Sequence, residues 1–148
     1  MDKHYLDPID MLKIATQHVY CANYLLKQNA EVFLDKELSI DALLPINSLM
    51  YIAFELTLKA YVVHDYREIR QYKTLLELIE LNHALLLSQK DMQLIKTLAR
   101  QQAFRKGVDY ALWENRQQLH VFCEEIMALY ERLQEFMPLE LQSDYVSS

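Results

Sequence analysis

The chain has 148 residues, a net charge of −6, 52% hydrophobic residues and a single glycine. This size and composition fit one globular domain over residues 1–148. Phosphate-binding loops, Rossmann fingerprints and nucleophile elbows need several residues without a Cβ, so these enzyme classes are excluded. Several β-hairpins would also need glycine-containing turns, and an all-β fold is therefore not expected.

The first predicted helix spans residues 8–34. Asp7 can cap its free N–H groups, and Pro8 suits its first turn. Apolar residues then recur every three or four positions as far as Phe33, which is typical of an amphipathic helix. The stretch from Asp35 to Pro45 breaks this period and is predicted to be an ordered connection.

The segment SLMYIAFELTLKAYVV after Pro45 is apolar on nearly every side and predicts the central helix of a bundle, ending near His64. Its polar exceptions, Glu55 and Lys59, are four residues apart with the glutamate first, the favoured order for an intrahelical ion pair. Half-burial of such a pair costs desolvation energy, so we interpret it as serving specificity or function rather than stability.

Three further helices are predicted. Leucines indicate one at residues 68–86, and Ser88-x-x-Asp91 resembles a capping box opening another that should stop at Gly107. Apolar spacing predicts the last helix at residues 111–136, with a frayed tail at about 139–148. Long amphipathic helices with short connections give an all-α, up-and-down bundle of four to five helices. We expect its core to include Ile14, Leu25, Ile52, Phe54, Leu56, Leu98, Phe122, Ile126 and Leu129.

Location and redox state are predicted from the same sequence. The N-terminal residues contain no apolar signal-peptide region, and no apolar run approaches the roughly 20 residues that cross a bilayer. A soluble, cytoplasmic protein is expected. Cys21 and Cys123 form no CxxC pair and are interpreted as small buried apolar residues in a reducing compartment.

Two groups of side chains are candidates for chemistry. Di-iron helix bundles carry two Glu-x-x-His pairs, and this chain has one, Glu80-x-x-His83, so no metal or cofactor is expected. Arg116, His120 and Glu124 are spaced four and four, which places them on one face of the last helix. An arginine can hold phosphate oxygens while a histidine moves a proton, allowing phosphodiester cleavage without metal. Alternatively, this face makes only surface ion pairs.

Charge is distributed unevenly along the chain. Residues 67–106 carry 8 basic and 4 acidic side chains, whereas both flanking segments are acidic. The basic side chains indicate either a phosphate-binding surface or a solvated helix face. The candidates for nucleic-acid contacts are Arg67, Arg70, Lys96, Arg100, Arg105 and Lys106. The numerous tyrosines, among them Tyr20 and Tyr24, either stack on bases or fill helix interfaces.

The central segment resembles the second core helix of the HEPN superfamily of small α-helical bundles. There a small apolar run leads into Glu-Leu-x-Leu-Lys-Ala, here Glu55 to Ala60. Lys73-Thr-Leu-Leu-Glu-Leu resembles the place where many members have Lys-x-His-Asp-Leu, although the His-Asp is missing here. Many members are ribonucleases with Arg-x4-6-His near the start of the last helix. The matching place here holds Arg116-x3-His120, one residue shorter.

This resemblance covers roughly residues 10–135 and implies a homodimer from a toxin–antitoxin or defence setting. The partners it implies are RNA or a cognate antitoxin-like protein. A homodimer is also expected because the central helix has more apolar surface than one neighbour covers.

Two functions remain open at this point. The first is a nucleic-acid-directed protein, either an RNA- or nucleotide-binding module or a metal-independent endoribonuclease. In the nuclease, Arg116 would hold the phosphate, His120 would act as general acid or base, and Glu124 would orient the imidazole. The second is a non-enzymatic interaction or dimerisation module with no role in nucleic-acid chemistry.

Overall fold

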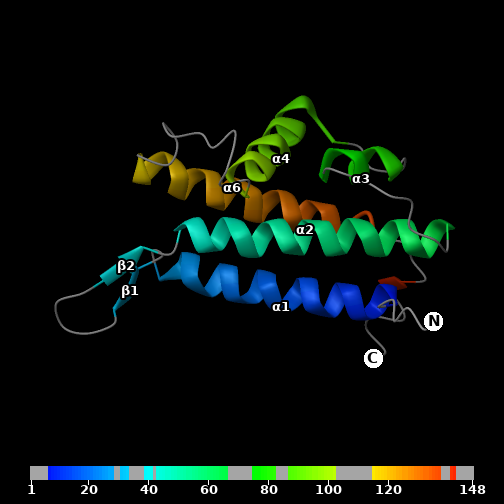
Figure 1. The fold of residues 1–148 in the computed structure, drawn as a ribbon, viewed down its shortest axis with the longest axis horizontal. Helices are drawn as coiled ribbons and strands as arrows, with labels where there is room; N and C mark the ends of the chain where they lie inside the picture. Colours follow the sequence, from blue (N-terminus) through cyan, green and yellow to red (C-terminus); the bar gives the residue numbers. More distant parts are fainter. Residues whose placement is uncertain are drawn as a thin grey trace.

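The computed structural model describes residues 7–28, 31–33, 39–41, 43–66, 75–82, 87–102, 115–137 and 141–142. Most of these residues are helical, which confirms the all-α bundle (Figure 1). The helices are α1 (Pro8–Lys27), α2 (Leu43–Tyr66), α3 (Leu75–Leu81), α4 (Gln89–Gln102) and α6 (Arg116–Gln134). Two short strands, β1 (Glu31–Phe33) and β2 (Ser39–Asp41), form a hairpin between α1 and α2.

The helices run up and down, with α2 at the centre. In Figure 1, α1 and α2 are antiparallel, α3 and α4 together return the chain, and α6 follows the direction of α2. Cross-helix contacts agree, because Asn47 of α2 meets Cys123 of α6 and Tyr61, further along α2, meets Leu133. Helix α2 packs against α1, α3, α4 and α6, as predicted for the central helix.

The first helix is shorter than its periodicity predicts. Asp7 caps it by accepting a hydrogen bond from the Asp10 N–H at 2.9 Å, and Pro8 occupies its first turn. It ends at Lys27 rather than at residue 34, because Val32 and Phe33 lie in β1. Val32 pairs with Ile40 in an antiparallel register, and β-branched and aromatic residues favour such pairing. Leu26 and Phe33 are seven residues apart, which is also the spacing of apolar residues on one face of a helix, so the periodicity predicted a longer helix.

Capping side chains mark the starts of α4 and α6. The Ser88 hydroxyl accepts from the Asp91 N–H at 3.0 Å, and the Asp91 carboxylate accepts from the Ser88 N–H at 3.2 Å. This reciprocal pair confirms the predicted capping box. Helix α6 begins at Arg116 rather than residue 111, with the Asn115 side chain accepting from the Gln118 N–H. The predicted stop at Gly107 lies outside the described residues.

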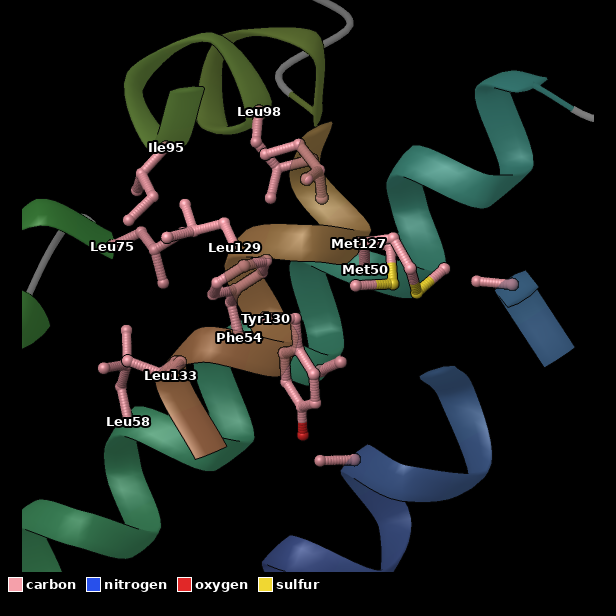
Figure 2. Packing of buried hydrophobic residues seen from close by; sticks show 14 of the residues in the cluster. Met50, Phe54, Leu58, Leu75, Ile95, Leu98, Met127, Leu129, Tyr130 and Leu133 are labelled. Atoms are coloured by element: carbon pink, nitrogen blue, oxygen red, sulfur yellow. The ribbon is translucent and has the colours of Figure 1, made fainter. Parts of the chain in front are cut away.

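One hydrophobic core fills the space between the helices. Figure 2 shows Phe54, Leu58, Leu98 and Leu129 from three helices converging within it. The ring of Phe54 meets that of Tyr130 edge to face, with centroids 5.3 Å apart. Five of the nine expected core residues are buried, namely Phe54, Leu98, Phe122, Ile126 and Leu129.

The other four expected core residues are more accessible. Ile14, Leu25 and Leu56 are only partly buried, and Ile52 is 39% exposed, so its placement in the core was wrong. The reason is geometric: neighbours cover α2 on its other sides and leave one side open. A helix that is apolar all round therefore still presents some apolar residues to its surroundings.

Several polar groups inside the bundle are hydrogen-bonded across helices. The Thr57 and Tyr130 hydroxyl oxygens lie 2.7 Å apart, and the Tyr61 hydroxyl donates to the Leu133 carbonyl at 3.3 Å. Burial, and secondarily the neighbouring Tyr130, raise the pKa of the Tyr61 phenol above its usual value. Asn82 donates to the carbonyls of Leu58 and Leu78. These bonds link α2 to α3 and α6 at fixed positions.

By length and composition alone, the Leu43–His64 part of α2 could cross a membrane, contrary to the expectation that no segment would. However, 56% of that apolar window is buried inside the bundle, as in the core helix of a soluble protein.

The two cysteines differ in their exposure. Cys123 is buried as expected, but Cys21 is exposed because it lies on the side of α1 turned away from α2.

Candidate functional site

The candidate catalytic side chains lie on the N-terminal half of α6. Arg116 is the first helical residue, and His120 and Glu124 follow at intervals of one turn. The Nδ1 atom of His120 lies 3.0 Å from Oε1 of Glu124. The imidazole is three-quarters buried, whereas Arg116 and Glu124 are exposed. The predicted grouping on one helical face is therefore present.

The bond to Glu124 has a chemical consequence for the imidazole. A carboxylate accepts hydrogen bonds, so Nδ1 carries the proton in this contact and donates it. In the neutral ring the other nitrogen, Nε2, is then left with a lone pair that can accept a proton. A carboxylate that fixes the tautomer of a histidine in this way is a common support for general-base catalysis.

The structure describes two of the six residues that are candidates for nucleic-acid contacts. Lys96 and Arg100 are exposed and lie one turn apart on α4, so they share one face of that helix. Arg67, Arg70, Arg105 and Lys106 lie outside the described residues, as does His83 of the Glu-x-x-His pair.

The predicted ion pair between Glu55 and Lys59 forms within α2. Lys59 Nζ is 3.5 Å from Glu55 Oε1, with about a quarter of each side chain exposed. Both residues belong to α2, whereas Arg116, His120 and Glu124 belong to α6. The predicted half-buried intrahelical pair is therefore confirmed.

An open depression lies on another face of α6 and was not predicted. Its volume is about 600 Å³, and none of the three candidate catalytic residues lines it. The described lining residues are Asn115, Gln117, Gln118, Val121, Phe122 and Glu125. Nζ of Lys90 on α4 lies 3.7 Å from Oε2 of Glu125, one of these lining residues. Glu125 is the charged residue among the described lining residues, and its carboxylate already pairs with Lys90.

Sequence reasoning also missed an ion pair that is held by two hydrogen bonds. Arg132 of α6 donates from both terminal nitrogens to the carboxylate of Asp91, at 3.0 and 3.3 Å. Burial alone would raise the pKa of Asp91, but the bonds from Arg132 and Ser88 outweigh it and hold that pKa below its usual value. Asp91 was recognised only as a capping residue, because a partner 41 positions away leaves no local signal.

Among the residues that the structure describes, no group of three or more His, Cys, Asp or Glu side chains is arranged to hold a metal ion. Comparisons with protein-family models, with curated proteins and with solved structures gave no significant match.

Proposed function

We propose that the chain is an HEPN-like, RNA-directed protein whose working face is Arg116, His120 and Glu124. The observation that carries this proposal is the 3.0 Å contact between His120 Nδ1 and Glu124 Oε1, which orients a partly exposed imidazole. Arg116, one turn away and also exposed, supplies a planar cation suited to phosphate oxygens. Phosphodiester cleavage without a metal requires a positioned base and a nearby group that binds the phosphate, and these residues supply both.

In the cleavage reaction we propose, Nε2 of His120 removes the proton from a ribose 2′-hydroxyl. The 2′-oxygen then attacks the adjacent phosphorus, and the bond from phosphorus to the 5′-oxygen breaks. The imidazolium returns its proton to the leaving 5′-oxygen, directly or through water, and a 2′,3′-cyclic phosphate remains. Arg116 stabilises the charge that develops on the non-bridging phosphate oxygens, and Glu124 stabilises the imidazolium.

Phosphate binding also requires local positive charge at the protein surface. The chain is acidic overall, so a phosphate backbone needs local cations to approach it. Besides Arg116, exposed cations occur at Lys96 and Arg100 on α4. Salt-dependent binding is the expected signature of such contacts.

The experiment is cleavage of a fluorescent single-stranded RNA in EDTA by wild type and variants. We expect His120→Ala and Arg116→Ala to lower the rate about 100-fold or more, and Glu124→Gln to lower it less. His18→Ala, a histidine on α1, and Lys90→Gln, an exposed cation on α4, serve as matched controls and should behave as wild type. Binding without cleavage would leave a non-catalytic RNA-binding module, while no binding and no cleavage would refute the proposal.

A second candidate function is self-association through the open side of α2. The observation favouring it is Ile52, 39% exposed, with partly buried Leu49 and Leu56 one turn to either side. We expect wild type to sediment as a dimer at micromolar concentration and Ile52→Glu as a monomer. Val121→Glu, at a comparably exposed apolar position on α6, is the control that should remain dimeric. A monomeric wild type would rule this candidate out.

A further inference from the structure

The outer face of α1 carries two exposed aromatic rings that the α6 chemistry does not use. Tyr20 is 73% exposed and Tyr24 is 59% exposed, more than any other large hydrophobic residue described. Lys13, Gln17 and Lys27 are exposed on the same helix. Steps of four, three, four and three residues keep these five side chains on one face, which we name the tyrosine–lysine stripe.

The stripe is separated from the packed side of the helix. Leu12, Ala15 and Ala22 are buried on the side of α1 that packs against α2. Figure 1 shows α1 at the edge of the bundle, with α2 on one side and no described helix on the other. The two rings are therefore not filling an interface within this chain.

The charge of the stripe is opposite to that of the molecule. Its ionic residues are two lysines, in a chain whose net charge is −6. The one acidic residue of α1 is Asp10, in the first turn and far from the tyrosines. A second copy docking stripe to stripe would oppose lysines to lysines, which disfavours self-association here. An anionic partner with flat apolar faces complements both the lysines and the rings.

We propose that the tyrosine–lysine stripe binds single-stranded nucleic acid, with bases stacked on Tyr20 and Tyr24 and phosphates near Lys13 and Lys27. Aromatic side chains flanked by cations are how proteins hold unpaired strands, because every base has a face that can stack. The bases of a duplex are already stacked on each other and do not offer those faces.

The dimensions of the stripe fit an extended strand. The helical rise separates Tyr20 from Tyr24 by about 6 Å, wider than the roughly 3.4 Å per nucleotide in a duplex. From Lys13 to Lys27 the rise is about 21 Å, enough for roughly three or four extended nucleotides. The stripe thus accepts a short segment without reading its sequence.

This inference rests on the proposed RNA-directed function and supplies it with a substrate class. Figure 1 shows the last turns of α1 and the first turns of α6 at the same end of the bundle, where the hairpin projects. Tyr24 and Lys27 belong to those turns of α1, and Arg116 and His120 belong to those turns of α6. A strand held on the stripe therefore extends toward the end of the bundle where the cleavage residues lie.

The test is fluorescence anisotropy with a labelled 12-nucleotide oligouridine whose 2′-O-methyl groups block cleavage. The double variant Tyr20→Ala/Tyr24→Ala should bind about 30-fold more weakly, since each lost stacking contact weakens binding about fivefold or more. The matched variant Tyr20→Phe/Tyr24→Phe keeps both rings and should bind as wild type does. Lys13→Gln/Lys27→Gln should reduce the slope of log affinity against log salt by about 1.4.

Control measurements separate this inference from the cleavage proposal. Lys90→Gln, an exposed cation on α4, should leave binding unchanged. An equally labelled duplex should bind more weakly than the single strand. If both tyrosine variants bind as wild type, or if the alanine variant instead changes the sedimentation of the protein alone, the stripe is not a nucleic-acid site. If stripe variants lose binding but His120→Ala cleaves RNA normally, the stripe stands and the cleavage assignment fails.

Discussion

Removal of the hydroxyl of Tyr130 should show how much the buried hydrogen bond to Thr57 contributes to stability. Thr57 is fully buried, Tyr130 is 4% exposed, and their oxygens are 2.7 Å apart. Tyr130→Phe keeps the edge-to-face contact with Phe54 but leaves the Thr57 hydroxyl without this partner. We expect a loss of about 1–3 kcal/mol in the free energy of unfolding, the usual penalty for a buried polar group left unbonded.

Replacing both Tyr130 and Thr57 tests whether their hydroxyls bond to each other directly. Thr57→Val should cost a similar amount on its own, because the Tyr130 hydroxyl then loses the same bond. Replacing both partners removes both polar groups, so the double variant should lose at least about 1 kcal/mol less than the two single losses combined. Urea denaturation followed by circular dichroism measures all three, with the exposed Tyr20→Phe as control. Strictly additive losses would refute a direct bond between the two hydroxyls.

Three further measurements test packing, electrostatics and cysteine exposure. Leu129→Ala should destabilise the fold by about 2–5 kcal/mol in the same urea assay, whereas Ile52→Ala, at an accessible position, should cost about 0.5 kcal/mol. The pKa of Asp91 is lowered in the fold, so its stabilising effect is present above its unfolded pKa of about 3.9 and is lost as pH falls through the lower, folded value. Asp91→Asn should therefore flatten the acid end of the stability profile, and an unchanged profile would contradict the ion pair. A thiol reagent should label Cys21 in the native protein and Cys123 only after unfolding.

Local signals in the sequence were sufficient to predict much of the fold. Asp7 and Pro8 identified the start of α1, and Ser88 with Asp91 identified the start of α4, because capping depends on residues within one turn. The end of α1 was misplaced because a leucine–phenylalanine spacing of seven suits a helix, whereas strand pairing with Ile40 decides the outcome. Pairing of that kind depends on residues outside the local window.

In the candidate site too, contacts between residues close in the sequence could be predicted, and contacts between distant residues could not. His120 and Glu124 are four apart on one helix, so their contact could be predicted from spacing. Exposure could not be predicted in the same way, because it depends on which sides of a helix its neighbours cover. Ile52 and Cys21 were both expected inside, yet each faces away from the packed sides of its helix. The bond from Arg132 to Asp91 joins α6 to α4 and follows only from their packing.

Nuclear magnetic resonance of the histidine rings is the most direct test of whether RNA reaches α6. The carbon–proton ring signals of His120 are recorded while a 2′-O-methyl single-stranded RNA is added to the intact protein. We predict that these signals shift progressively to saturation and that Arg116→Ala weakens the response. Unmoved His120 signals at an RNA concentration that saturates binding by anisotropy would contradict the assignment of α6 as the working face.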